Sequence, residues 1–410
     1  WYPLFTQPFI FREVEGLRRL LPLSVFTLYG RNLRQCSTEM RAAAGRSYVL
    51  GARRLFPVLG EVLRQTLLHP RRTWKLLRRS VCRRWQSWET LGENFWAFCV
   101  GLYLGRLFQD AGIDMIYAPW PRGTATAAWV AASITGLPFA TAARGDNLAP
   151  ADPDLGDKLE AAFFIRANNA ADLARIEAFD QGQASGKVAL VYNSLTLPPA
   201  PPESAPTDEP TPPGAVRPMP RPVRLLALGR FDVTKGFDVL LRACALLAER
   251  KVPFQLEVVG QGPERMALRR LARRLGLRGR VRFVPRVPHE NMPDVYGRAD
   301  IFVAPGRRTP QGDVDGLPSA LVEALASGLA VVVSDLPGQL EAVRQGENGL
   351  VTPQEDVEAL AGALETLAAS EEERRRLGRA ARQALPALLD GEATEARFVQ
   401  LFKSACAVQR

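Results

Sequence analysis

Six short apolar runs, spaced through the second half of this 410-residue chain, limit its fold more than any other feature. The runs at 301–304 and 329–333 are continuously apolar rather than alternating with polar residues, and amphipathic helical stretches separate the six runs. Strands of this kind are buried on both faces, which favours a parallel sheet with helices on each side. The runs lie at residues 223–228, 254–259, 281–284, 301–304, 329–333 and 349–351.

A proline-rich segment, residues 198–222, divides the chain. It contains eleven prolines with Ser, Thr, Asp and Glu among them, and such a segment stays extended instead of forming a packed core. Because 410 residues also exceed one ordinary core, we predict two α/β domains. The predicted parts are an N-terminal Rossmann-like domain at 1–197, the linker at 198–222, a C-terminal Rossmann-like domain at 223–388, and a final helix at 389–410 that packs back on the first domain.

The first half follows the same α/β class with a weaker pattern. The chain begins at Trp1 and not at a methionine, which predicts that residues upstream are missing and that the first strand of this domain lies before Trp1. The predicted elements are a helix at 7–20, a strand at 23–28, a long helical region at 51–108, and strands at 115–117 and 188–192.

The composition excludes several classes of protein. Five cysteines without paired spacing indicate neither a disulfide framework nor a zinc site, so we expect a reducing compartment. Two histidines leave little material for histidine metal sites or a histidine-based triad. A formal charge of +10 favours partners that carry phosphate, and no apolar run is long enough to predict a membrane-spanning helix.

The stretch from Asp315 to Glu323 predicts a helix start that faces a ligand. Gly316 turns freely, Pro318 suits the first turn of a helix, and Gly328 is placed to end it. The first amide groups of such a helix are unpaired and lie at the positive end of its dipole, so they favour a phosphate or a hydroxyl-rich group. The amides that we expect to face the ligand belong to Gly316, Leu317, Ser319 and Ala320.

A second candidate site follows the strand at 223–228. Gly229 and Arg230 end this strand, and Lys235 precedes the next helix. The two cations are suited to clamp a diphosphate, whose charge must otherwise be met by backbone amides or a metal. The alternative is an exposed pair of loop charges. Gly260 opens a compact turn after the next strand, which lets a ligand approach the backbone.

In this order the motifs closely resemble glycosyltransferase family 4. They are Gly229-Arg230 with Lys235-Gly236, Val259-Gly260-Gln261-Gly262, Ala299-Asp300-Ile301-Phe302-Val303-Ala304-Pro305, and Asp315-Gly316-Leu317-Pro318 continuing to Glu323-Ala324. The resemblance implies the GT-B fold, in which two Rossmann-like domains with parallel sheets face a central cleft. The family usually has Glu at the first acid of this motif, where Asp315 keeps the acceptor chemistry with a shorter reach.

The resemblance also implies roles for these residues. Glu323 would hold the ribose hydroxyls, Asp315 and the amides after it would hold the donor sugar, and Arg230 with Lys235 would hold the diphosphate. Val284 to Arg286 would lie along the base. The donor would be a UDP- or GDP-linked sugar, used as a substrate and not as a cofactor.

Asp313-Val314-Asp315 also matches Asp-x-Asp, a metal-binding signature of a different glycosyltransferase fold. We reject that interpretation, because these acids lie within a loop where helix amides and basic residues already serve the phosphates. We therefore predict chemistry without a metal.

The first half resembles the N-terminal segment of polysaccharide-building members of the family. Thr6 belongs to the resembling segment, and Arg144 stands where a histidine near the reacting sugar is usual. Arginine cannot act as a base near neutral pH, which puts activity as well as specificity in question. Asn168 is expected to line the cleft, or else to cap a turn, and Trp120 is a further candidate for acceptor choice.

Residues 64–88 form a basic and aromatic segment. Eight Lys or Arg and no acid lie between Arg64 and Arg84, interleaved with Trp74 and Trp85 and followed by Trp88. This pattern is typical of a helix on a membrane surface, and the alternative is an exposed basic face whose tryptophans belong to the core. The absence of a recognition module argues against nucleic acid.

From the sequence we expect a retaining, metal-independent hexosyltransferase of cell-surface polysaccharide synthesis that uses a glycan or lipid-linked acceptor. We expect it in the cytoplasm, peripheral to the inner face of the cell membrane. One alternative is a catalytically silent nucleotide-sugar-binding protein of the same fold. A nucleotide-sugar epimerase is the other, which the scarcity of titratable bases disfavours.

Overall fold

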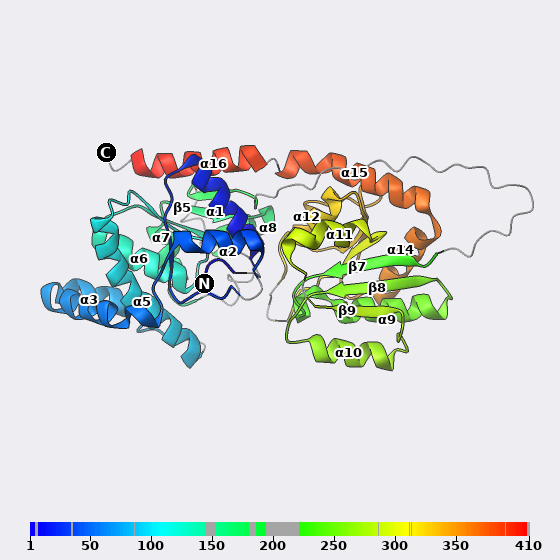
Figure 1. Cartoon of the computed structure of the whole chain (residues 1–410), viewed down its shortest axis with the longest axis horizontal. Coiled ribbons are helices and arrows are strands. Elements are labelled where there is room, and N and C mark those ends of the chain that lie inside the picture. Colours follow the sequence, from blue (N-terminus) through cyan, green and yellow to red (C-terminus); the bar gives the residue numbers. More distant parts are fainter. Residues whose placement is uncertain are drawn as a thin grey trace, which may run out of the picture. The chain divides into compact units, whose positions relative to one another are not determined.

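The computed structural model describes residues 1–4, 7–33, 36–85, 87–143, 152–179, 186–193, 221–285, 287–310, 312, 314–389 and 391–407 (Figure 1). The chain divides into two compact units. The first unit holds residues 1–194 together with 391–410, and the second holds residues 195–390.

The second unit contains a six-stranded sheet in which every pairing is parallel. This confirms the α/β fold class. Four of the six predicted strands have the predicted bounds, and the last two lie one residue further along. In sheet order the strands are β12 (Leu350–Thr352), β11 (Ala330–Ser334), β10 (Ile301–Ala304), β7 (Val223–Leu228), β8 (Phe254–Val259) and β9 (Val281–Val284).

Alternate side chains of these strands pack on opposite faces of the sheet. Leu225 and Ala227 belong to a core that includes Leu240 and Leu364, whereas Phe302 packs beside the ring of Tyr296. The helices that pack on these faces are α9 (Phe237–Glu249), α10 (Arg265–Arg274), α11 (Met292–Gly297), α12 (Ser319–Ala326), α13 (Pro337–Leu340), α14 (Val357–Ala369) and α15 (Glu371–Leu389).

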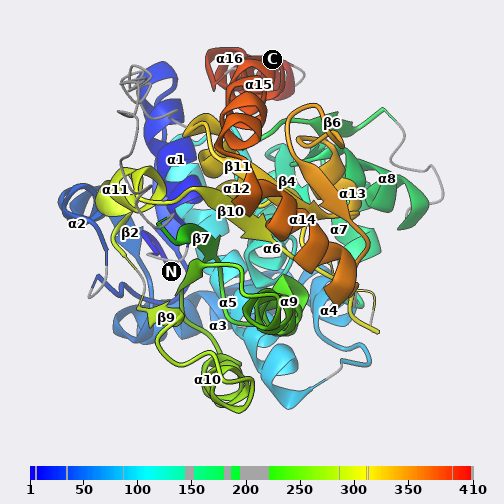
Figure 2. The same ribbon diagram turned by 90° about the vertical axis from the view of Figure 1, so that its right-hand side faces the viewer.

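The strand order reverses between β7 and β10, which lie side by side (Figure 2). The chain proceeds from β7 to β8 and β9 on one side, and from β10 to β11 and β12 on the other. The loops after β7 and β10 therefore diverge at the carboxyl edge of the sheet. In open α/β sheets this switch point is where ligands bind.

The first unit contains a four-stranded parallel sheet, β3 (Ile116–Ala118), β4 (Phe139–Ala143), β5 (Phe164–Ala167) and β6 (Val188–Leu190). A separate parallel pair joins β1 (Val25–Thr27) to β2 (Ser47–Val49). The strands β2, β4 and β5 were not predicted. β4 is rich in alanine and β5 is interrupted by Arg166, and both features weaken the apolar signal of a strand.

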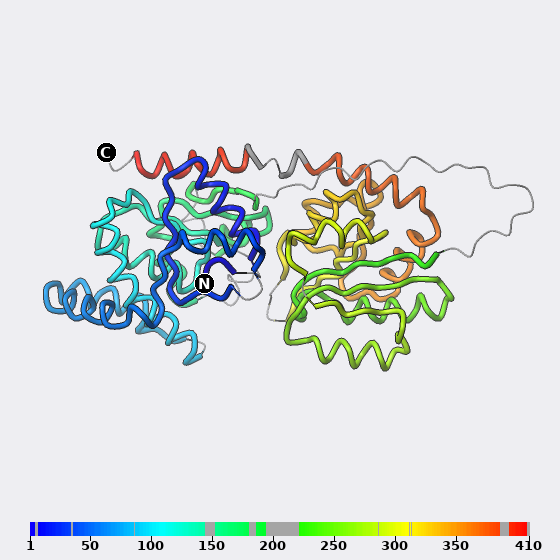
Figure 3. Tube along the Cα trace, in the orientation of Figure 1, coloured from blue at the N-terminus to red at the C-terminus, as the bar shows by residue number. Residues whose placement is uncertain are grey.

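The predicted helical region at 51–108 is interrupted. It consists of the short turn η2 (Ala52–Arg54) and three helices, α3 (Leu55–Leu68), α4 (Pro70–Ser80) and α5 (Trp88–Asp110). A one-residue break at His69 separates α3 from α4 because Pro70 starts the second helix. Their traces lie at the margin of the first unit (Figure 3).

Close helix packing forms the core of the first unit. Gly101 and Gly105 let α5 approach α6 (Gly123–Thr135), because a Cβ at either position would lie under 3 Å from Val130 or Ile134. The other helices are α1 (Pro8–Leu20), α2 (Thr38–Ala43), α7 (Leu155–Ala161) and α8 (Ala170–Phe179), with the turn η1 (Ala44–Arg46).

The last helix, α16 (Gly391–Ala407), belongs to the first unit and packs on α1. Its Phe398 is buried in a cluster with Leu17 of α1 and Phe164 of β5. The guanidinium carbon of Arg166 lies 4.7 Å from the centre of the Phe398 ring. A segment from the far end of the chain thus completes the first core.

Candidate functional site

The loop after β7 turns sharply under the loop after β10. Gly236 has a φ of +62°, and a Cβ there would lie 1.8 Å from the carbonyl oxygen of Pro305. Only glycine allows both the left-handed backbone and this approach. The close contact holds the turn η4 (Val233–Lys235), and with it Lys235, against the switch point.

Lys235 donates a hydrogen bond from its ammonium to a carboxylate oxygen of Asp315. Their side chains are about one-fifth exposed, at 21% and 18%. The two residues are 80 positions apart in sequence, and they were assigned separately to the diphosphate and the sugar. The structure brings them together, so both groups face the same small region at the edge of the sheet.

The start of α12 presents unpaired amides beside Asp315. Among the described residues, the backbone N–H groups of Gly316, Leu317, Ser319 and Ala320 donate no hydrogen bond. Pro318 at the N-cap provides no side-chain cap for them. Unpaired N–H groups at a helix start favour a negatively charged or hydroxyl-rich ligand.

Glu323 is held in place by a tyrosine that the sequence analysis did not identify. The hydroxyl of Tyr296, on the buried side of α11, lies 3.0 Å from Glu323 Oε2 and 3.2 Å from the carbonyl oxygen of Ala320. Leu321 and Leu325 face the core, so Glu323 lies on the opposite, partly exposed side of α12. Tyr296 thus orients the carboxylate of Glu323.

Three further residues shape this edge without belonging to any motif. Gly338 allows α13 to touch the backbone of Gly316, because a Cβ there would lie 2.4 Å from the carbonyl carbon. The buried Gln339 accepts a hydrogen bond of 2.8 Å from the amide of Ser334. Arg307 donates to the carbonyl oxygen of Val233 at 2.9 Å and so braces the turn that carries Lys235.

The remaining predicted donor residues lie at the same sheet edge with fewer constraints. Arg230 is 72% exposed, and its Nε lies 3.3 Å from a carboxylate oxygen of Asp232. The carbonyl oxygen of Gly229 is 1.9 Å from where a Cβ on Gly260 would lie, so these two turns are in direct contact. Val284 ends β9, and Arg286 lies outside the described residues.

The first unit carries its own candidates at the carboxyl edge of its sheet. Trp120 follows β3 and meets Phe9 edge to face at 6.2 Å. Asn168 follows β5, is only 6% exposed, and has no hydrogen bond on either side-chain polar atom within the described part of the chain. A buried amide without partners is costly unless a ligand or water satisfies it. Thr6 and Arg144 lie outside the described residues.

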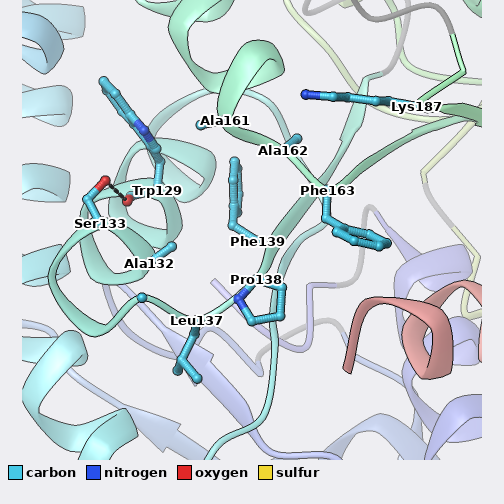
Figure 4. A pocket seen from close by; sticks show the side chains of 11 residues that line it. Trp129, Ala132, Ser133, Leu137, Pro138, Phe139, Ala161, Ala162, Phe163 and Lys187 are labelled. Atoms are coloured by element: carbon cyan, nitrogen blue, oxygen red, sulfur yellow. Dashed lines mark hydrogen bonds between the residues drawn. The ribbon is translucent and has the colours of Figure 1, made fainter. Parts of the chain in front are cut away.

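A separate pocket of about 490 Å³ opens at the opposite edge of that sheet (Figure 4). Trp129, Phe139 and Phe163 line it, and Lys187 lies at its side. It adjoins the amino ends of β4 and β5. Ligands of open α/β sheets bind at the carboxyl ends of strands, so this pocket is not part of the candidate site.

The described residues offer neither a metal-binding cluster nor a membrane-spanning helix. Within the described ranges, no three or more His, Cys, Asp or Glu side chains gather as metal ligands would. The prediction of a metal-independent reaction stays a prediction. Among the helices described here, none is both long and apolar enough to cross a bilayer.

Comparison with known proteins matches the second unit to one family. Residues 217–384 match the family described as "Glycosyl transferases group 1". The amylovoran biosynthesis glycosyltransferase AmsK of Erwinia amylovora is 32% identical over 151 residues, which cover 37% of this chain and 37% of AmsK. A GDP-mannose-dependent alpha-(1-6)-phosphatidylinositol monomannoside mannosyltransferase of Mycolicibacterium smegmatis is 37% identical over 150 residues, covering 36% of this chain and 39% of that enzyme. The chain thus spans little more than a third of each relative.

A solved structure extends the likeness in fold to most of the chain. The crystal structure of HepE from Anabaena, in complex with UDP and glucose, is similar with a TM-score of 0.60. The match covers 74% of this chain and 81% of HepE at 19% sequence identity. Residues 217–384 therefore belong to the group 1 glycosyltransferases, also called glycosyltransferase family 4, within a chain that has the GT-B fold.

Proposed function

We propose that this protein is a retaining, metal-independent glycosyltransferase that moves a hexose from a nucleotide diphosphate sugar to a glycan or lipid-linked acceptor. The observation that carries the proposal is the meeting of Lys235, Asp315 and the unpaired amides of α12 at the switch point of the second unit. This arrangement offers cationic and N–H donors for phosphates and a carboxylate for sugar hydroxyls within one region.

The donor would bind in stages along this edge. The ammonium of Lys235 would leave Asp315 and pair with the diphosphate. The exposed guanidinium of Arg230 would pair with the diphosphate as well. The freed carboxylate of Asp315 would then accept hydrogen bonds from hydroxyl groups of the hexose, while the amides of Gly316 and Leu317 would donate to its oxygen atoms. Glu323, oriented by Tyr296, would accept bonds from the ribose hydroxyls.

Charge stabilisation at the leaving diphosphate would supply most of the catalysis. As the bond to the sugar breaks, negative charge would grow on the departing phosphate, and Lys235, Arg230 and the amides at the start of α12 would stabilise it. By family resemblance, the acceptor attacks from the face that the diphosphate leaves, and the departing phosphate takes its proton. No protein base is needed, so an arginine at position 144 is compatible with transfer.

The first unit would select the acceptor. Asn168 and Trp120 lie at the carboxyl edge of its sheet, and the buried amide of Asn168 offers a donor and an acceptor for a sugar hydroxyl. The relatives named above act in amylovoran biosynthesis and on a phosphatidylinositol mannoside, which supports an acceptor for cell-surface polysaccharide or lipid-linked glycan. Such an acceptor suits an enzyme at the inner face of the cell membrane.

The nucleotide of the donor can be tested directly. HepE binds UDP and the mannosyltransferase uses GDP-mannose, so both classes belong in a thermal-shift panel of nucleotide sugars. A true donor at a hundredfold excess over its Kd stabilises the fold by about 2.7 kcal/mol, which raises Tm measurably. If no UDP- or GDP-linked sugar raises Tm, the donor assignment is wrong.

Replacing Glu323 by Ala tests the site. We expect kcat/KM for nucleotide release to fall about 10- to 100-fold with Tm nearly unchanged, because a charge-assisted hydrogen bond to the ribose is lost from a partly exposed position. Tyr296→Phe should give a smaller loss, since it removes only the group that orients Glu323. Unaltered turnover in Glu323→Ala would remove its role.

The same assay separates the rival activities. A silent binding protein would show donor affinity by calorimetry with no nucleotide release for any acceptor. An epimerase would convert the donor without consuming an acceptor.

A further inference from the structure

The helix α3 buries a side that carries polar residues and exposes a side that carries apolar residues. Its inward side carries Val58 with two polar residues, Glu61 and Gln65, all of them buried. Its outward side carries four large apolar residues at three- and four-residue spacing, so they form one stripe. They are Phe56, Leu59, Leu63 and Leu67, with exposed fractions of 83, 49, 61 and 71%.

The buried polar side of α3 is well satisfied, so this orientation is stable. The carboxylate of Glu61 accepts hydrogen bonds from Arg64 at 2.8 Å, from Gln65 at 2.8 Å and from Arg106 at 3.4 Å. Burial would raise the pKa of Glu61, yet the bonds from Arg64 and Gln65 hold it below its usual value. Rotating the apolar stripe inward would break these hydrogen bonds.

The next helix, α4, continues the pattern with cations. Trp74 is 61% exposed, and Arg71, Lys75 and Arg78 lie on the same side of the helix at positions −3, +1 and +4 from it. None of these three cations forms an ion pair or hydrogen bond within the ranges described above. Residues 62–88 contain no Asp or Glu, so no acid within this segment neutralises them.

We propose that these residues form a face, here called the α3–α4 face, that docks on a bilayer of anionic lipid. The face consists of Phe56, Leu59, Leu63, Leu67, Arg71, Trp74, Lys75 and Arg78. A helix with Leu and Phe on one side, and with nearby Lys, Arg and Trp, suits the boundary between acyl chains and headgroups. Each cation near an anionic leaflet adds roughly fivefold to binding. This inference stands independently of the proposed transfer reaction.

The geometry favours a position along the surface. The 14 residues of α3 extend about 21 Å, which is less than the roughly 30 Å of the hydrocarbon core. Its inward side, which packs on α5, is not available to lipid. A second copy of the chain is a poorer occupant, because a symmetric contact would oppose the same unpaired cations.

The first test is co-sedimentation of the full chain with vesicles. We expect binding to phosphatidylglycerol mixed with phosphatidylcholine, and little binding to phosphatidylcholine alone. Leu63→Ser with Leu67→Ser should weaken this binding at least about tenfold, since both side chains leave water on docking. The matched control is Phe179→Ser, a 42% exposed apolar residue at the end of α8, which should bind like the wild type.

The second test reverses charge. Lys75→Glu with Arg78→Glu should weaken binding to the anionic vesicles by more than about tenfold and should flatten its dependence on salt. The control is Arg269→Glu with Arg273→Glu on α10, an equally basic and exposed helix without an apolar stripe. Because every substituted residue is exposed, Tm should change little. The rate of nucleotide release in the presence of a soluble acceptor should also be unaffected.

Three results would overturn the proposal. One is wild-type protein that stays in the supernatant with anionic vesicles. Another is a control variant that loses as much binding as its partner variant. The third is a Leu63- and Leu67-dependent dimer in size-exclusion chromatography without vesicle binding, which would assign the face to contact between copies. None of these three results depends on donor binding, so the proposed function is tested by separate experiments.

Discussion

At the scale of single residues, the contact between Lys235 and Asp315 matters most. In the absence of donor each neutralises the other, so neither charge is left uncompensated at the half-buried sheet edge. In the proposed reaction a diphosphate, which carries a higher charge, would compete with Asp315 for the same ammonium. Donor binding would then exchange the contact between Lys235 and Asp315 for one between Lys235 and the diphosphate.

Replacing Lys235 by Met tests this role. The substitution keeps the length of the side chain but removes its charge, so we expect nucleotide release to fall about 10- to 100-fold, through weaker donor binding and a less stabilised leaving group. Steady-state kinetics with a donor identified by thermal shift measures both effects. Lys251→Met, at an exposed loop after α9, is the matched control and should match the wild type.

How far single site residues follow from sequence depends on whether they form a local motif. Asp315, Glu323 and Lys235 were predicted because glycine, proline and strand ends surround them at fixed spacing. Tyr296, Gly338 and Arg307 were not, because each acts through a contact with a distant segment. Tyr296 lies 27 residues from Glu323, and its spacing carries no signal of a shared carboxylate.

At the scale of elements, the turn before α9 depends on one glycine. Gly236→Ala would place a Cβ on the carbonyl oxygen of Pro305 and impose a left-handed backbone on alanine, which costs about 1–2 kcal/mol before the clash is counted. We expect donor affinity to fall more than about tenfold as Lys235 moves, with a lower Tm. Calorimetry with donor measures this. Gly276→Ala is the control, because it has a similar φ of +68° with nothing within 4 Å.

The strands β7 and β10 are joined by an acid that responds to pH. Asp300 accepts bonds from the Arg224 amide at 2.8 Å and guanidinium at 3.1 Å. Burial would raise the pKa of Asp300, but these bonds hold it below its ordinary value. Its stabilisation is therefore complete above the unfolded pKa, near 3.9, and is lost as pH falls through the lower folded pKa.

Asp300→Asn should reveal this dependence. Near neutral pH we expect a loss of about 1–2 kcal/mol, discounted for the partial exposure of Arg224, and a smaller loss below about pH 3. Denaturant unfolding at several pH values measures it. Glu347→Gln, in a surface pair with Arg344, should change stability by less than about 0.5 kcal/mol. A pH-independent loss would contradict the assigned role.

Element prediction differed between the units for a physical reason. Central strands of the second unit are nearly continuous apolar runs buried on both faces, as β10 and β11 show. In the first unit, β4 consists of small residues after Phe139, and such residues resemble loop or helix in sequence. That the apolar stripe of α3 points outward follows only from the structure.

At the scale of the whole molecule, the chain crosses between its units twice. It leaves the first unit after residue 194 and returns at residue 391. Phe398 anchors the return, with its ring centre 5.2 Å from that of Tyr117 and 6.3 Å from that of Phe164. The stability of the first unit thus depends on a helix that follows the second unit in sequence.

Phe398→Ala should destabilise the first unit selectively. Truncating a buried Phe typically costs about 3–5 kcal/mol, and here the stacked guanidinium of Arg166 would lose its partner as well. Hydrogen exchange should accelerate in β5 and β6 while β7 and β10 stay protected. Phe179→Ala, at the exposed end of α8, provides the comparison. Equal acceleration in both sheets would contradict selective coupling.

The placement of α16 also affects how the protein is made. A ribosome releases residues 1–194 long before residues 391–407, and at about 5–20 residues per second the gap lasts on the order of tens of seconds. Throughout that interval α16 does not yet cover the aromatic surface of β5 around Phe164. Nascent chains therefore expose an apolar surface that chaperones can bind. The rate at which the second unit is translated then determines how long this apolar surface stays exposed.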